Sequence, residues 1–251
     1  MKKLLLVLGC SILFFASCTH AGNLQTTTNG QQEAVSQNQA GDNSLTAAKN
    51  RVGLKLEYGK APLIIDKFLP WGMKREILTR EYALKHYAKE ETKIIPRVVV
   101  VHWTAGPTWQ SAYQWFYKAD RGDGTVNVSS QFLVDRDGSI YRLMPENKLA
   151  RHIIGYNWCA IGIENVGGVE NKEDLTPAQL KADTELIRYL QSKYPTIKFV
   201  WGHYQQNAAR ASGLYLENVL GYQSVKSDPG PKFMRSLRLN LETSGLIFYP
   251  E

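Results

Sequence analysis

A run of four valines at residues 98–101 constrains the fold of this chain more than any other feature. Valine is β-branched, and its restricted side chain favours extended backbone. The run lies within IIPRVVVVHW and is continuously apolar, without the alternation of a strand that has one face in water. Such a run is typical of a strand that is buried on both faces, inside a sheet that helices cover on both sides.

Apolar periodicity predicts further strands and helices along the chain. We expect a hairpin over residues 129–144, whose two alternating strands surround Asp137 and Gly138, a pair that suits a tight turn. The other predicted helices lie within 75–89 and 111–117 and after Thr176, and the other predicted strands lie within 159–167 and 197–203.

Two prolines mark the starts of predicted helices. Thr176 can cap the first of these helices, Pro177 suits its first turn, and Gln179 completes a capping box. Pro231 can open the last helix of the domain. Because strands and helices interleave, with one hairpin included, the sequence predicts an α/β domain with a mixed central β-sheet flanked by helices.

Residues 1–18 have the pattern of a lipoprotein-type signal peptide. Two lysines precede an apolar stretch that is too short to span a bilayer as a mature helix. The Phe-Ala-Ser-Cys ending resembles a bacterial lipobox, which implies a lipid on Cys18 and attachment to a membrane. We therefore expect an exported protein that is lipid-anchored in the cell envelope, and Thr19 favours the outer membrane, facing the periplasm. The alternative is a plain signal peptide with an incidental cysteine.

Composition divides the rest of the chain into three parts. Residues 19–50 are rich in Thr, Asn, Gln, Gly and Ser, and cannot bury enough apolar surface to offset the entropy of ordering, so we expect a flexible tether. We expect an N-terminal extension packed on the core at 51–95 and the main domain at 96–245. The formal net charge of +7 fits an anionic envelope surface, an acidic substrate or an ordinary soluble protein. We find no nucleic-acid-binding motif and expect no nucleic-acid partner.

The five histidines of the chain differ in their surroundings. His20 and His86 lie in polar stretches, and we expect both to be exposed to solvent. His102 and His203 each follow a predicted strand, and His152 lies between the hairpin and the next strand. Although each has an ordinary structural interpretation when taken singly, histidines at strand ends can converge on one edge of a sheet.

Two imidazoles and one carboxylate with an open fourth position are typical of a catalytic zinc site. His102, His203 and Asp228 supply this set. Cys159 is a competing soft ligand, but it lies on a predicted strand among apolar neighbours and is less well placed. Asp228 precedes Pro-Gly-Pro, and we expect a type II turn that aims its carboxylate.

Five stretches, in this order along the chain, resemble the zinc-dependent N-acetylmuramoyl-L-alanine amidases of the type 2 class, whose fold the peptidoglycan recognition proteins share. The stretches are VVVHWTAG, SSQFLVDRDGSIYRLMPENKLARHIIG, NWCAIGIENVGG, VWGH and KSDPGPKF. The resemblance implies that residues 96–245 are an amidase domain. It also implies that His102, His203 and Asp228 bind zinc and that the chain acts on peptidoglycan or muropeptides.

The resemblance further implies that Glu164 and Lys226 are the catalytic pair. A carboxylate can take a proton from the attacking water and pass it to the leaving amine. A lysine is a point charge suited to a developing oxyanion. The structural alternatives are a strand-end carboxylate that caps a loop for Glu164 and a solvated side chain for Lys226. We expect His152 and Trp103 to contact the substrate.

Residues 204–225 make the stretch between two of the predicted ligands longer than the resemblance predicts. Tyr215, Leu216 and Tyr222 within this insertion either contact glycan or stem peptide or anchor the insertion to the core. The leading functional hypothesis is cleavage of the amide between N-acetylmuramic acid and L-alanine. A non-catalytic peptidoglycan-binding module of the same fold is the alternative. A zinc peptidase is a third hypothesis, disfavoured by the lack of an HExxH motif.

Overall fold

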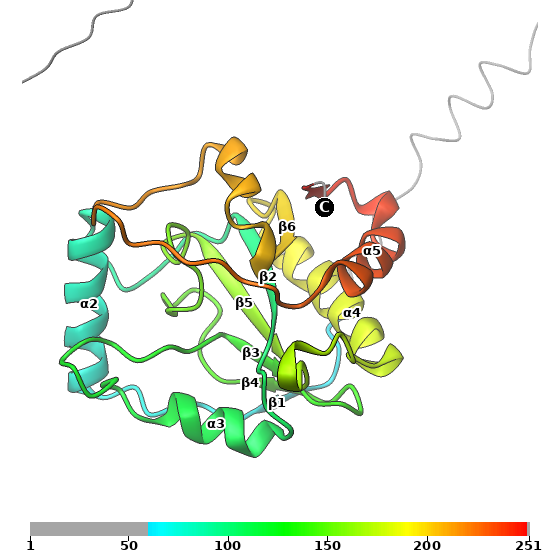
Figure 1. Cartoon of the computed structure of the whole chain (residues 1–251), viewed down its shortest axis with the longest axis horizontal. Coiled ribbons are helices and arrows are strands. Elements are labelled where there is room, and N and C mark those ends of the chain that lie inside the picture. Colours follow the sequence, from blue (N-terminus) through cyan, green and yellow to red (C-terminus); the bar gives the residue numbers. More distant parts are fainter. Residues whose placement is uncertain (1–59, 250–251) are drawn as a thin grey trace, which may run out of the picture. The chain divides into compact units, whose positions relative to one another are not determined.

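The computed structural model describes residues 60–249, which form a sheet with helices packed against it (Figure 1). The predicted signal peptide, Cys18 and the tether lie outside the described residues. The strands are β1 (Ile64–Asp66), β2 (Val98–Trp103), β3 (Phe132–Val134), β4 (Ile140–Arg142), β5 (Ala160–Asn165), β6 (Phe199–Gly202) and β7 (Ile247–Phe248). The α-helices are α2 (Met73–Tyr87), α3 (Trp109–Tyr117), α4 (Pro177–Lys193) and α5 (Pro231–Asn240).

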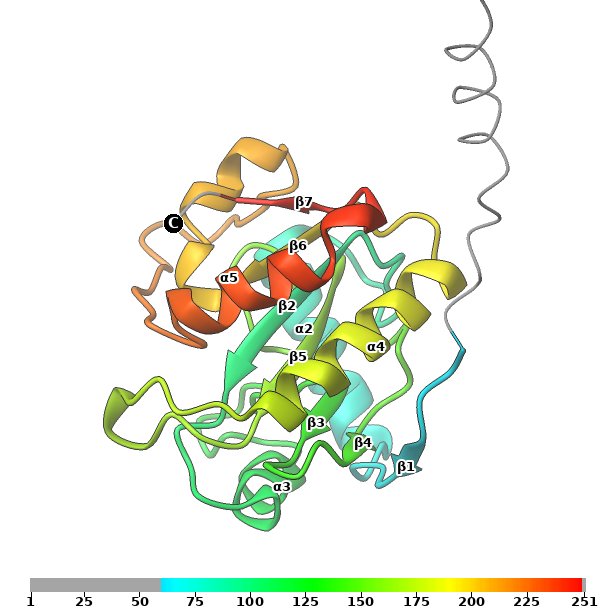
Figure 2. The ribbon, with the colours of Figure 1, turned by 90° about the vertical axis from the view of Figure 1, so that its right-hand side faces the viewer.

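The seven strands form one mixed sheet in the order β1-β4-β3-β5-β2-β6-β7. Strands β3 and β4 pair antiparallel as the predicted hairpin, and the other neighbouring pairs are parallel. Helices α4 and α5 lie side by side across one face of the sheet, and α2 lies on the opposite side (Figure 2). The predicted α/β class with a mixed central sheet is therefore confirmed.

Strand β2 lies inside the sheet with all six of its residues buried, as the valine run predicts. Val99 and Val101 belong to the apolar cluster that α4 and α5 complete. Val98 and Val100 point to the other face, where they join a cluster with Tyr156. Because successive strand residues point to opposite faces of a sheet, the side chain of His102 points to the same face as those of Val98 and Val100.

The predicted start of α4 is confirmed in detail. The Thr176 hydroxyl accepts a hydrogen bond from the Gln179 backbone N–H at 3.2 Å, and the Gln179 side chain accepts one from the Thr176 N–H at 2.8 Å. Pro231 is the first residue of α5, as expected. None of the helices within residues 60–249 is long and apolar enough to cross a membrane.

The prediction that His86 is exposed is wrong. This side chain lies on α2 but is buried, and its Nδ1 lies 2.8 Å from Glu217 Oε1. The partner is 131 residues away, inside the insertion at 204–225. A polar local sequence did not indicate burial because the hydrogen-bond partner of His86 comes from a distant part of the chain.

Candidate metal centre and active-site cleft

The carboxyl ends of three parallel strands place most of the predicted site. Strands β5 and β2 pair in a register that sets His102 beside Glu164. Strand β6 lies on the other side of β2 and ends at Gly202, so His203 follows directly. In open α/β sheets, ligands bind at the carboxyl ends of the strands.

Asp228 reaches this edge from a turn that is tied to the end of β6. Its carbonyl accepts a hydrogen bond from Tyr204 N at 2.9 Å. Gly202 permits the close approach, because an added Cβ would lie 2.7 Å from Pro229 Cδ. The predicted type II turn is wrong, since Gly230 has φ 90° and ψ 151° where that turn requires ψ near 0°. The carboxylate nevertheless points toward the histidines.

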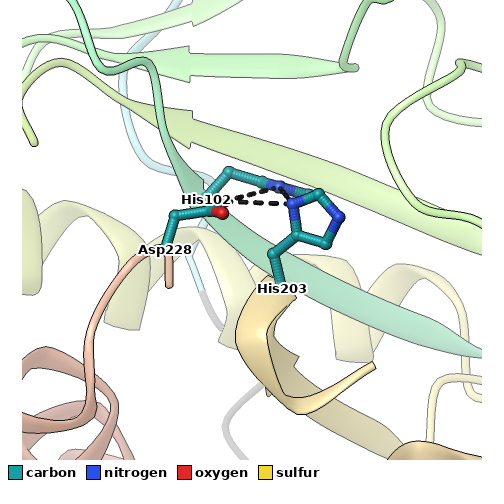
Figure 3. Close-up of side chains that lie close together, drawn as sticks. All are labelled: His102, His203 and Asp228. Carbon is teal, nitrogen blue, oxygen red and sulfur yellow. Dashed lines mark hydrogen bonds and ion pairs between the residues drawn. The ribbon is translucent and has the colours of Figure 1, made fainter. Parts of the chain in front are cut away.

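The three predicted ligands meet with metal-like spacing (Figure 3). His102 Nδ1 lies 3.0 Å from His203 Nδ1, and Asp228 Oδ2 lies 3.1 Å from each of these nitrogens. Ligand atoms at about 2.1 Å from a tetrahedral zinc ion are about 3.4 Å apart. The donor set and its spacing therefore fit a zinc ion, and all three side chains are buried.

Burial sets the protonation states that metal binding requires. Burial, followed by the charge of His203, lowers the pKa of His102 to about 4, which leaves a neutral imidazole at neutral pH. Burial opposes ionisation of Asp228, but hydrogen bonds to His102 and His203 outweigh it and hold the pKa of this carboxyl well below its usual range. His102 and Asp228 are thus held as a neutral imidazole and a carboxylate, the forms in which these side chains bind metal.

His152 contacts the second nitrogen of His102. His102 Nε2 lies 3.0 Å from His152 Nδ1, and His152 Nε2 lies 3.4 Å from the carbonyl of Ala160. The His152 ring lies over β5 at Gly162, where an added Cβ would come within 2.9 Å of the ring. Because metal-binding histidines usually donate their other N–H to a fixed acceptor, this contact orients His102. Nothing in the local sequence indicated this contact, and the prediction that His152 contacts substrate stays a prediction.

One cleft of ≈ 670 Å³ contains the whole predicted site. The predicted residues that line it are His102, Trp103, His152, Glu164, His203, Lys226 and Asp228. Lining residues that sequence analysis missed include Trp115, Arg151 and Asn171. The only available signal for Arg151 was its position next to His152 in LARHIIG, whereas Trp115 was indistinguishable from an apolar helix residue.

Glu164 lies half-buried in this cleft with an unusual environment. Its Oε2 is buried and has no hydrogen-bond partner. Burial raises the pKa of Glu164 well above its ordinary value, the Asp228 carboxylate raises it further, and the Lys226 ammonium lowers it. A carboxyl with a raised pKa can both accept and return a proton near neutral pH.

Cys159 does not join the cluster of possible ligands. It lies in the apolar core with Tyr156 and Trp201. Burial raises the pKa of its thiol to about 12. Because thiols bind metal as thiolates, its role as a competing ligand has no support.

Tyr215, Leu216 and Tyr222 anchor the insertion at 204–225 to the rest of the domain and do not line the cleft. Tyr215 packs edge-on to Tyr156, and Leu216 N donates to the carbonyl of Gly155 at 3.0 Å. The Tyr222 hydroxyl accepts a hydrogen bond from Arg151 Nη2 at 3.0 Å. The structure therefore favours the anchoring interpretation for all three.

Comparison with known proteins agrees with the fold. The family described as N-acetylmuramoyl-L-alanine amidase matches residues 91–231. The chain belongs to this family. The endolysin of Escherichia phage T7 is 33% identical over 75 residues, which are 28% of this chain and 50% of the relative. The endolysin of Enterobacteria phage T3 matches to the same extent, so the chain spans about half the length of the curated relatives it matches.

A solved structure shares the fold over most of its length. The endolysin N-acetylmuramoyl-L-alanine amidase LysCS from Clostridium intestinale has a TM-score of 0.50 and 21% identity. The alignment covers 73% of this chain and 98% of that one. At this identity the likeness concerns the fold alone.

Proposed function

We propose that this protein is a zinc-dependent amidase that cleaves the bond between N-acetylmuramic acid and the L-alanine of the peptidoglycan stem peptide. The observation that carries the proposal is the convergence of His102, His203 and Asp228 beside Glu164 in one cleft. Family membership supports the reaction and the substrate class.

His102, His203 and Asp228 would hold the zinc ion, and the atoms that converge are Nδ1 of each histidine and Oδ2 of Asp228. When bound, zinc polarises a carbonyl and makes water a usable nucleophile at neutral pH. His152 fixes the orientation of His102 from the side away from the ligand cluster.

Glu164 moves the proton in this scheme. Its carboxylate accepts a proton from the attacking water and then donates it to the departing amine of L-alanine. The neighbouring Asp228 and the buried position of Oε2 favour holding this proton between the two steps. Breaking the amide bond as the amine takes up the proton leaves a free lactyl carboxylate on N-acetylmuramic acid and releases the stem peptide with a free amino terminus.

Lys226 supplies a positive charge to the cleft. Its ammonium group stabilises the negative charge that develops on the amide oxygen as water adds. Trp103 and His152 line the same cleft, and we assign them to substrate contact.

Mass spectrometry of reaction products tests this proposal. Zinc-loaded protein should release the intact stem peptide from a defined muropeptide, and chelator-treated protein should not. Restoring zinc should restore release, with calcium as the matched control. Binding without release in the zinc-loaded state would favour the non-catalytic alternative, and cleavage within the stem peptide would favour a peptidase.

We also propose that Cys18 carries a lipid that anchors the protein in the outer membrane, facing the periplasm. The support is the signal-like segment that ends in Phe-Ala-Ser-Cys. Metabolic labelling with a palmitate analogue should mark the full chain, and Cys18→Ser should abolish the label. Labelling that survives this substitution, or its absence from the parent chain, would overturn the anchor.

A further inference from the structure

Arg151 is a partly exposed cation in the wall of the cleft, next in sequence to His152. Its Nη1 donates to the carbonyl of Val126 at 2.6 Å and to Thr125 Oγ1 at 3.2 Å. Its Nη2 donates to the hydroxyl of Tyr222 at 3.0 Å. A carbonyl and two hydroxyls thus hold the guanidinium in a fixed orientation.

This guanidinium has no counter-charge among residues 60–249. Two other arginines of the described chain pair with carboxylates, Arg136 with Asp174 at 3.2 Å and Arg142 with Asp66 at 2.7 Å. Arg151 forms no ion pair of this kind within the described residues, and its three bonds leave part of its five-donor fork free. A partly desolvated cation with free donors favours binding of an anion.

The insertion at 204–225 positions the acceptor for Arg151. Its Tyr222 packs against the ring of His86 at 4.5 Å between ring centroids. His86 in turn stacks on Tyr82 at 4.1 Å, and the Arg151 guanidinium lies 5.2 Å from the Tyr82 ring. Helix α2 and the insertion therefore form one aromatic support behind the arginine.

A buried polar pair joins α2 to the insertion. His86 Nδ1 lies 2.8 Å from Glu217 Oε1, and Asn218 N donates to the His86 carbonyl at 2.9 Å. Both side chains are buried. The extra length of the insertion is thereby used to hold Tyr222, and through it Arg151, at the cleft.

We propose that Arg151 is a specificity-determining residue that pairs with a carboxylate of the stem peptide, on the residue that follows L-alanine. This inference rests on the proposed function. The lactyl carboxyl of muramic acid is consumed in the scissile amide, so the remaining carboxylates of the substrate lie on the peptide. The planar fork of arginine matches a carboxylate through two parallel hydrogen bonds.

A matched pair of substrates tests the inference. The two are muramoyl dipeptides that differ only at the second residue, which carries a free carboxylate in one and the carboxamide in the other. Zinc-loaded wild-type protein should prefer the acid by about 10- to 100-fold in kcat/KM, the range expected for a hydrogen-bonded charge. Arg151→Met should bring this ratio close to one, because it should slow cleavage of the acid far more than cleavage of the amide.

Two further variants separate recognition from folding. Tyr222→Phe keeps the ring and removes the acceptor, so it should raise KM for the acid substrate and leave kcat unchanged. Arg136→Met removes a surface arginine that pairs with Asp174, and should leave the ratio unchanged. Thermal melts should show that all variants are folded.

A wild-type protein that treats acid and amide alike, or an Arg151→Met variant that keeps the wild-type ratio, would overturn the inference. Calorimetric binding of the same two compounds to zinc-loaded Glu164→Gln protein gives a readout that needs no turnover. Selective binding of the acid that depends on Arg151, together with no cleavage by wild type, would refute the amidase and keep the carboxylate site.

Discussion

At the scale of single residues, Glu164 is the side chain on which the proposed chemistry most depends. Replacing it by glutamine keeps its size and removes its ability to carry a proton. We expect Glu164→Gln to lower kcat by about 100-fold or more, since positioned acid–base groups contribute about that much. Metal content should be unchanged, because Glu164 is not among the three clustered ligands. Normal turnover in the variant would contradict the assigned role.

Asp183 on α4 is a second carboxyl whose environment has a measurable consequence. It is fully buried, its Oδ2 accepts a hydrogen bond from Asn165 Nδ2 at 2.9 Å, and its Oδ1 has no partner. Burial raises its pKa to about 7, and the hydrogen bond from Asn165 only partly offsets this. The same Asn165 amide contacts the carbonyl of His102 at 3.3 Å, so this pair lies directly behind the candidate metal centre.

The raised pKa of Asp183 predicts a pH dependence of stability. The folded state keeps the proton to about pH 7, whereas the unfolded chain releases it near its ordinary value of 3.8. Its contribution to stability is fully present below 3.8 and is lost as the pH rises through about 7.

We therefore expect Asp183→Asn to be more stable relative to wild type at pH 8 than at pH 4, by about 1–4 kcal/mol. Urea unfolding at both pH values measures this difference. A difference that stays constant with pH would show that Asp183 is ionised in the folded protein.

At the scale of secondary-structure elements, the sequence predicted the strands, turns and helix ends that depend on neighbouring residues. The valine run placed β2, Asp137 and Gly138 placed the hairpin turn, and Thr176 with Gln179 placed the start of α4. These features depend on residues within a few positions of one another. The partners of His86 and Arg151 lie far away in the sequence and had no local signal.

Helix α2 supports α3, which forms one wall of the cleft, through a buried arginine. Arg75 Nη2 donates to the last carbonyls of α3, those of Phe116 at 2.9 Å and Tyr117 at 3.0 Å. Its Nε donates to the carbonyl of Pro70 at 3.0 Å. A cation at a helix C-terminus satisfies free carbonyls and interacts favourably with the helix dipole.

We expect Arg75→Met to lower the free energy of unfolding by about 3 kcal/mol, because several carbonyls lose a charged donor. Arg80→Met, at an exposed position of the same helix, is the matched control and should change stability little. Urea unfolding measures both. Equal effects of the two substitutions would argue that the buried contacts of Arg75 are not important for stability.

The contact between α2 and the insertion predicts coupling between His86 and Glu217. Glu217→Gln weakens a buried charged hydrogen bond, and we expect a loss of about 2 kcal/mol. Once His86 is replaced by leucine, the same change at Glu217 should cost clearly less. A double-mutant cycle measures this coupling. Strictly additive effects would mean that the pair does not fasten the insertion.

At the scale of the whole molecule, the candidate site joins parts that are far apart in the chain. His102 comes from the centre of the sheet, His203 follows β6, and Asp228 comes from the turn before α5. The sequence predicted this ligand set because residue type and strand-end position both carry chemical meaning. It did not predict the contact between His152 and His102, which depends on how a loop folds back over β5.

A metal held by three distant segments should also stabilise the fold. Because the unfolded chain has no assembled site, zinc at about 1,000 times its dissociation constant should add about 4 kcal/mol to the free energy of unfolding. Thermal melts with zinc and with chelator should differ accordingly for wild type, and the difference should vanish in Asp228→Ala. A zinc-dependent shift that survives this substitution would place the ion elsewhere.

The most direct test of the central claim is the zinc content of the purified chain and its ligand variants, measured by atomic emission after dialysis against metal-free buffer. We predict about one zinc per wild-type chain, as for a site with three protein ligands. His102→Ala, His203→Ala and Asp228→Ala should each retain far less, while Cys159→Ala should match wild type. A full complement of zinc in any of the three ligand variants, or none in the wild-type chain, would contradict the account.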